Sequence, residues 1–182
     1  MTIDARNVAV WITGLPASGK STITRMLKPR LEELNLVVEV LESDALRQVL
    51  TPDPTYSESE RDLFYRAMAY MGSRLVAHGV TVIFDATASK RAYRDFARSL
   101  IPRFIEVSLE CPLELCMRRD YKGTYRRGQR GETSTVPGLQ VPYERPINPE
   151  LRIDTTTVSP PEAALKVVAL IKERFPAPDL KA

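Results

Sequence analysis

Apolar residues recur along the chain in two alternating patterns, short continuous runs and longer stretches with helical spacing. The continuous runs predict strands that are covered on both faces, and they are Val8–Ile12, Leu36–Leu41, Val80–Phe84 and Phe104–Leu109. Apolar residues three or four positions apart predict helices, and these are Ser21–Leu34, a long helix from a Ser57–Glu60 capping box to Gly79, Ser89–Leu100, Pro112–Arg119 and Pro161–Phe175. Strands that alternate with helices predict an α/β fold with a parallel sheet between helical layers.

The segment between the first predicted strand and its helix fits the phosphate-binding pattern GxxxxGK[ST]. Unpaired N–H groups at the start of a helix suit a polyphosphate. We therefore expect ATP to bind Gly14, Leu15, Pro16, Ala17, Ser18, Gly19, Lys20, Ser21 and Thr22. Lys20 would reach the β- and γ-phosphates, and the Ser21 hydroxyl would bind Mg²⁺. A chance match in a glycine-containing turn is the alternative, against which the flanking strand and helix both argue.

Charged residues follow the second strand, at the sheet edge where parallel α/β folds bind ligands. Asp44 lies there, close enough to the phosphate loop to hold Mg²⁺ waters or to take a proton from an acceptor hydroxyl. Asp44 is also a candidate helix N-cap for Ala45 onward. Arg47 and Arg61 are candidates for binding a phosphate or sulfate on the acceptor side, although a solvated surface role is the more common fate of a single arginine.

The segment 121–149 is too long for an ordinary connection and mixes glycines and prolines with arginines. We expect it to be a basic lid that closes over a polyphosphate and excludes water. A solvated basic loop without a catalytic part is the alternative.

Composition agrees with one domain over residues 1–182, because 43% hydrophobic residues suffice for a core without disulfides or metals. Cys111 and Cys116 are expected to be core thiols of a reduced protein. Residues 1–6 lack signal-peptide character, and no apolar run approaches the ~20 residues of a membrane span. We expect a cytoplasmic location, no membrane partner and, at a net charge of +3, no nucleic-acid partner.

The motifs together resemble the adenylylsulfate kinase (APS kinase) family over nearly the whole chain. The most specific part is Phe104-Ile105-Glu106-Val107, Cys111-Pro112-Leu113-Glu114-Leu115-Cys116 and Arg119-Asp120-Tyr121-Lys122-Gly123-Thr124-Tyr125, which looks like the family's FIEV, TPLEVC and RDVKGLY series. The resemblance implies that Asp44 is the acceptor-side carboxylate. It also implies that Arg47, Arg61 and Lys122 contact the phosphosulfate nucleotide and that Tyr56 stacks on its adenine.

The departures from the family pattern gather on the acceptor side. Neutral or apolar residues replace polar or aromatic family residues at Ala45, Phe64, Ala88, Gln129 and Val136, of which Val136 stands where a lid aromatic would close the adenine sandwich. Asp85 adds a carboxylate where the family usually has a neutral residue. The donor half therefore matches the family better than the acceptor half.

The resemblance and the motifs predict the three-layer P-loop nucleoside-triphosphate hydrolase/kinase fold with a lid. The expected reaction is the ATP- and Mg²⁺-dependent phosphorylation of the 3′-hydroxyl of adenosine 5′-phosphosulfate, a step of sulfate activation, with Lys20 and Asp44 as catalytic residues. Two alternatives stay open: a kinase for another nucleotide-like or phosphorylated acceptor, and a non-catalytic nucleotide-sensing domain. A homodimer also stays open.

Overall fold

Five parallel strands form a sheet in the order β2-β3-β1-β4-β5. The computed structural model describes residues 7–176, so the N-terminal segment 1–6 considered above lies outside the described residues. The strands are β1 (Ala9–Thr13), β2 (Val38–Glu42), β3 (Thr81–Asp85), β4 (Phe104–Glu110) and β5 (Leu151–Asp154). Every residue of β1 and β3 is buried, as expected for central strands of a sheet that is covered on both faces.

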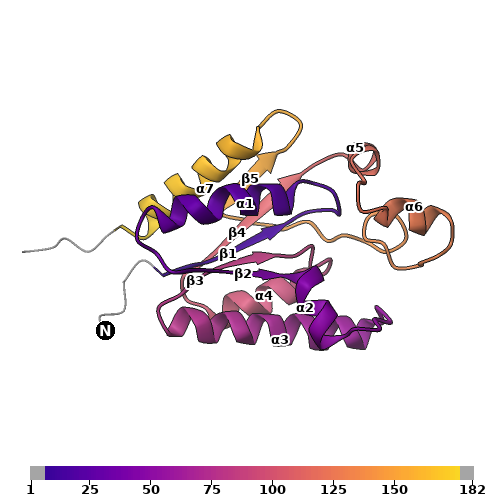
Figure 1. Cartoon of the computed structure of the whole chain (residues 1–182), viewed down its shortest axis with the longest axis horizontal. Coiled ribbons are helices and arrows are strands. Elements are labelled where there is room, and N and C mark those ends of the chain that lie inside the picture. Colours follow the sequence, from indigo (N-terminus) through magenta and orange to yellow (C-terminus); the bar gives the residue numbers. More distant parts are fainter. Residues whose placement is uncertain (1–6, 177–182) are drawn as a thin grey trace, which may run out of the picture.

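Helices cover both faces of the sheet (Figure 1). On one face α1 (Lys20–Glu32) and α7 (Pro160–Arg174) pack together, and on the other lie α3 (Glu58–Ala77) and α4 (Arg91–Leu100). The short helix α2 (Ser43–Leu50) follows β2, while α5 (Leu113–Arg118) and α6 (Thr124–Gln129) lie beyond the carboxyl ends of the strands. The three-layer α/β prediction is therefore confirmed, and no helix within residues 7–176 is long and apolar enough to cross a membrane.

The predicted strands and long helices all occur within a few residues of their expected positions, but two short elements were not predicted. They are β5 and α6, whereas α2 begins two residues before the helix from Ala45 onward that an Asp44 N-cap would give. Helix α1 also stops at Glu32, two residues early, because Asn35 adopts a left-handed φ of 59° that begins the turn into β2.

The predicted lid is less irregular than expected, because α6 forms inside it. Asp120 holds the start of α6, since its carboxylate accepts from the backbone N–H groups of Thr124 (2.8 Å), Tyr125 (2.8 Å) and Arg126 (3.1 Å). A small apolar core, here called the lid cluster, joins the lid to the phosphate loop; it consists of Cys111, Cys116, Tyr125 and Val136 with Leu15, Ala17, Leu113, Leu115, Met117 and Leu139 against them. Both cysteines are buried and free, as predicted.

Ion pairs and hydrogen bonds of two arginines on α4 hold the C-terminal end of the lid, near Glu144 and Glu150, against the sheet. Arg94 on α4 is only 1% exposed and donates to the Glu106 carboxylate on β4 (2.6 Å) and to the Glu144 carbonyl (2.7 Å). Arg98 makes a bidentate pair with Glu150 at 2.7 and 2.8 Å. The lid therefore returns to a rigid part of the fold just before β5.

Candidate active site

The phosphate loop connects β1 to α1 and has a glycine at a close approach and another in a left-handed conformation. A Cβ atom on Gly14 would lie 2.6 Å from the Ser18 hydroxyl oxygen and 3.0 Å from the Leu109 Cβ. Gly19 is the N-cap of α1, has a left-handed φ of 106°, and no side chain caps the helix there. The first N–H groups of α1 thus remain available to an anion, in the arrangement predicted from the motif.

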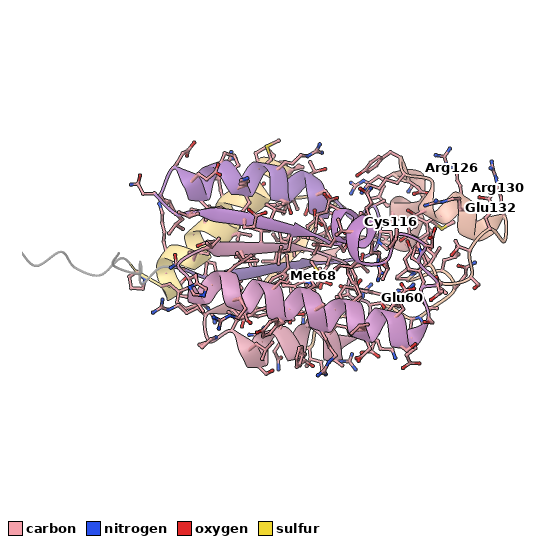
Figure 2. All side chains as sticks on the ribbon, turned by 60° about the horizontal axis from the view of Figure 1, so that its bottom comes forward. Glu60, Met68, Cys116, Arg126, Arg130 and Glu132 are labelled. Atoms are coloured by element: carbon pink, nitrogen blue, oxygen red, sulfur yellow. The ribbon has the colours of Figure 1, made fainter. Side chains whose placement is uncertain are left out.

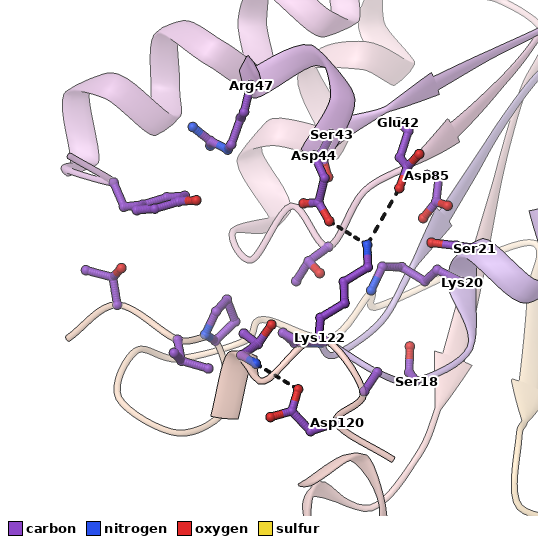
Figure 3. Close-up of a pocket in the computed structure, with 18 of the residues that line it drawn as sticks. Ser18, Lys20, Ser21, Glu42, Ser43, Asp44, Arg47, Asp85, Asp120 and Lys122 are labelled. Atoms are coloured by element: carbon purple, nitrogen blue, oxygen red, sulfur yellow. Dashed lines mark hydrogen bonds and ion pairs between the residues drawn. The ribbon is translucent and has the colours of Figure 1, made fainter. Parts of the chain in front are cut away.

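Lys20, Ser21 and Asp85 meet where β3 ends beside the loop (Figure 3). The Lys20 ammonium donates to the carbonyls of Gly14 (3.1 Å) and Leu15 (2.9 Å). Burial lowers the pKa of Lys20, although Asp85 and Asp44 oppose that shift. Burial raises the pKa of Asp85, which is 4% exposed, while Lys20 and a hydrogen bond from Ser21 act in the other direction. A cation and a carboxylate are therefore held in a partly dry site.

Asp44 faces this group from the first turn of α2. Its carboxylate accepts from the Lys122 ammonium at 2.7 Å, and Glu42 lies 3.7 Å from the same nitrogen (Figure 3). Burial on its own lowers the pKa of Lys122, but the bond to Asp44 and the charges around it raise the pKa above its ordinary value. The alternative role of Asp44 as the N-cap of this helix is wrong, because the N-cap of α2 is Glu42. The pair Asp44–Lys122 spans the cleft between α2 and the lid.

Arg47, Tyr56 and Arg61 gather at the far end of the cleft, as expected for one subsite. The Arg47 guanidinium lies 4.9 Å from the centre of the Tyr56 ring, and the Arg61 guanidinium lies 5.4 Å from it. Neither arginine is a simple solvated side chain. Arg47 is 8% exposed and pairs with Glu60, whereas Arg61 donates to the Thr135 carbonyl of the lid at 2.8 Å.

All the predicted site residues line one cleft of about 960 Å³ with the exception of Gly14 and Leu15, whose carbonyls hold Lys20 from behind. The cleft also continues past the phosphate loop to residues that the sequence analysis did not assign to the site, which are Arg119, Thr155, Val158 and Pro160. Thr155 directly follows β5, so it lies at the binding edge of the sheet for the same reason as Asp44 and Asp85. Recognising β5 in the sequence would have revealed this side of the cleft.

The arginines in and just before the lid differ in where they lie. Arg119 and Arg127 line the cleft. Arg126 and Arg130 lie at the outer tip of the lid and point away from the sheet (Figure 2). The expected basic lid therefore directs Lys122 and Arg127 into the cleft, whereas Arg126 and Arg130 correspond to the solvated alternative.

The chemistry of the cleft suits a metal that is bound mainly through its substrate. Residues 7–176 contain no group of three or more His, Cys, Asp or Glu side chains that could hold a metal ion. The oxygen donors that the phosphate loop offers are the Ser21 hydroxyl and, next to it, the Asp85 carboxylate. Magnesium prefers oxygen donors and keeps several waters and phosphate oxygens as ligands, so these residues fit a phosphate-bound Mg²⁺.

Comparisons with known proteins agree with this geometry. The family model of adenylylsulphate kinase matches residues 6–154. The chain is 35% identical over 168 residues to an adenylyl-sulfate kinase of Rippkaea orientalis, covering 92% of this chain and 93% of that protein. It is 37% identical over 163 residues to an adenylyl-sulfate kinase of Gloeothece citriformis, covering 90% and 93%. Among solved structures, the Mycobacterium tuberculosis APS kinase in complex with AMPPNP and APS superposes with a TM-score of 0.86 at 34% identity, covering 92% of this chain and 98% of that one.

Proposed function

Because the chain belongs to the adenylylsulphate kinase family, we propose that it transfers the γ-phosphoryl group of ATP to the 3′-hydroxyl of adenosine 5′-phosphosulfate (APS). Membership makes the chain a phosphotransferase with an alcohol acceptor. One observation carries the choice of acceptor. The phosphate loop and the Arg47–Tyr56 subsite line one cleft, in which Asp44 lies between Arg47 and the loop (Figure 3), and the M. tuberculosis relative of the same fold carries both AMPPNP and APS.

The donor half of the cleft would bind ATP through the phosphate loop. The N–H groups at the start of α1 suit the β-phosphate, and Lys20 would leave the loop carbonyls to contact the transferring group. Bound Mg²⁺ would neutralise charge on the β- and γ-phosphates, with Ser21 as its protein ligand and Asp85 holding that hydroxyl. Arg119 and Thr155 would lie on the nucleoside side of the phosphates.

The acceptor half would place the hydroxyl beside Asp44. In the structure Lys122 keeps Asp44 occupied at 2.7 Å, and an acceptor that carries its own anion would compete for the lysine and free the carboxylate. Asp44 would then accept the proton of the hydroxyl or orient it for attack. Tyr56 would stack on the adenine, and Arg47, Arg61 and Lys122 would bind the phosphosulfate.

The residues that depart from the family pattern differ in how deeply they are buried. Phe64 is 2% exposed and packs under Arg47, and Ala88 is buried with its N–H bound to the Tyr65 hydroxyl at 3.2 Å. Ala45 and Gln129 are exposed. Val136 lines the cleft but is 3% exposed, because it belongs to the lid cluster. An apolar Phe64 under the anion subsite is the one observation that favours the second candidate, a kinase for a different phosphorylated acceptor.

A kinase assay with Mg-ATP and a panel of acceptors tests the proposal. We expect APS to be phosphorylated and the product, mapped by phosphorus NMR and mass spectrometry, to carry the new group on the 3′-oxygen. ATP binding without turnover of APS, but with turnover of another acceptor, would favour the second candidate. Binding of ATP without turnover of any acceptor would favour a nucleotide-sensing domain. Light scattering on the purified protein would test separately for a homodimer.

A further inference from the structure

Glu60 uses its carboxylate in an unusual way for a residue of a capping box. Ser57 caps α3 by accepting from the Glu60 N–H at 3.3 Å, which is the first half of the box. In the second half, the glutamate would accept from the Ser57 N–H, but that N–H is bound by the Thr55 hydroxyl at 3.3 Å. The Glu60 carboxylate instead accepts hydrogen bonds from residues outside α3, on α2 and in the loop between α2 and α3.

One oxygen of Glu60 holds Arg47. Arg47 Nη1 donates to Glu60 Oε1 at 2.9 Å and, more weakly, to the Thr51 hydroxyl at 3.4 Å. The guanidinium is also covered on its faces, since its carbon lies 3.9 Å from the centre of the Phe64 ring and 4.9 Å from that of Tyr56. Within residues 7–176 Nε and Nη2 have no partner, and Arg47 lines the cleft (Figure 3). Glu60 therefore holds the Arg47 guanidinium through Nη1, while Nε and Nη2 remain available to a ligand in the cleft.

The second oxygen of Glu60 holds the loop that carries Tyr56. Glu60 Oε2 accepts from the N–H groups of Thr55 (2.5 Å) and Tyr56 (3.2 Å) and from the Thr55 hydroxyl (2.7 Å). Tyr56 has a left-handed φ of 54°, a conformation that a bulky residue adopts only where its surroundings enforce it. Its carbonyl is held as well, by Arg61 Nε at 3.0 Å. Glu60 therefore sets the backbone that directs the Tyr56 ring.

We propose that Glu60 is a positioning residue for the acceptor, which holds the Arg47 guanidinium and the Tyr56 ring at fixed separation without touching the acceptor itself. Burial alone raises the pKa of Glu60, but the bonds from Thr55 and Tyr56 and the Arg47 charge lower it below its ordinary value, so the carboxylate is charged at neutral pH. The role of this subsite rests on the proposed function, whereas the arrangement that Glu60 enforces can be measured without it.

Glu60→Gln tests the proposal, because the amide keeps the size of the side chain and loses its charge. Glu58→Gln is the matched control, since Glu58 lies in the same first turn of α3, its side chain is 79% exposed, and its ion pair is with Lys90. We expect Glu60→Gln to raise KM for APS ~10-fold, as for the loss of one charged contact, with kcat and KM for ATP within ~3-fold of the control. Equal KM values for APS in the two variants would overturn the proposal.

Hydrogen exchange separates this proposal from the proposed function. We expect the amides of Thr55 and Tyr56 to exchange ~10-fold faster in Glu60→Gln than in Glu58→Gln, because their acceptor is weakened. If the unmodified protein phosphorylates no APS, the proposed function fails, and exchange alone decides the positioning role, which equal rates would refute. Should Glu60→Gln not fold, Glu60→Asp is compared with Glu58→Asp by the same two measurements, since a side chain shorter by one methylene keeps the charge and lengthens the contacts to Arg47 and to the Thr55–Tyr56 backbone.

Discussion

Replacing Asp44 by Asn should reduce catalysis far more than stability. The Asp44 side chain is 63% exposed and its Lys122 partner is 44% exposed, and exposed ion pairs stabilise proteins by only ~0.2–1 kcal/mol. For a chain of this size such a loss lowers the thermal midpoint by at most about 4 °C. Loss of a general base, in contrast, slows the chemical step by ~10²–10⁴-fold, which corresponds to roughly 3–5 kcal/mol in the activation free energy.

The two readouts are therefore well separated, and one preparation provides both. Initial rates at saturating Mg-ATP and APS give kcat, and a thermal scan of the same sample gives the midpoint. Asp95→Asn, on the exposed side of α4, is a control for the loss of one negative charge. A kcat for Asp44→Asn within threefold of the control would refute the assignment of Asp44, whatever the thermal midpoint.

Two further predictions concern the donor site and the attachment of the lid. Lys20→Ala should lower kcat ~10²–10³-fold while far-ultraviolet circular dichroism stays unchanged, and turnover equal to the unmodified protein would contradict the donor site. Glu150→Gln should lower the free energy of unfolding at pH 7 by about 1–3 kcal/mol, because Glu150 is 10% exposed and bonds the Arg98 guanidinium. Burial raises the pKa of Glu150, but Arg98 lowers it overall below the ordinary 4.5, so this contribution is complete above pH 4.5 and lost as the pH falls below it. Denaturant titrations of the unmodified protein and of Glu150→Gln at pH 7 and pH 3.5 give the difference between their free energies of unfolding. We expect that difference to be smaller at pH 3.5, and an equal or larger difference would contradict the pairing of Glu150 with Arg98.

The elements that carry strong local signals were predictable from the sequence. β1 and β3 are continuous apolar runs, and the phosphate loop has a fixed motif between a strand and a helix. The elements that were missed take their stability from tertiary contacts. β5 has four residues and only Ile153 fully inside the core, and α6 consists largely of polar residues whose first N–H groups are held by the Asp120 carboxylate.

The candidate site shows the same division. Lys20, Ser21 and Asp44 were located from motif and strand position, and all three line the cleft. Thr155 was not found because its position depends on β5. Glu60 was assigned to a capping box from its spacing to Ser57, and that spacing contains no information about the direction in which the carboxylate turns. Such a contact across elements is a property of the folded chain.

The lid cluster restricts how this enzyme could be recombined with its relatives. The Tyr125 hydroxyl donates to the Pro16 carbonyl at 3.1 Å, and a Cβ atom on Gly138 would lie 2.5 Å from a Leu15 methyl carbon. The phosphate loop and the base of the lid are therefore packed as one unit, in which the shape of each depends on the other. A chimaera that exchanged residues 121–149 alone would leave Leu15 and Ala17 facing a foreign surface. Exchange of the loop 51–57, which carries Tyr56 and contributes no residue to that cluster, would leave the packing between the phosphate loop and the lid intact, so the part of the acceptor site formed by this loop can change independently of the ATP site.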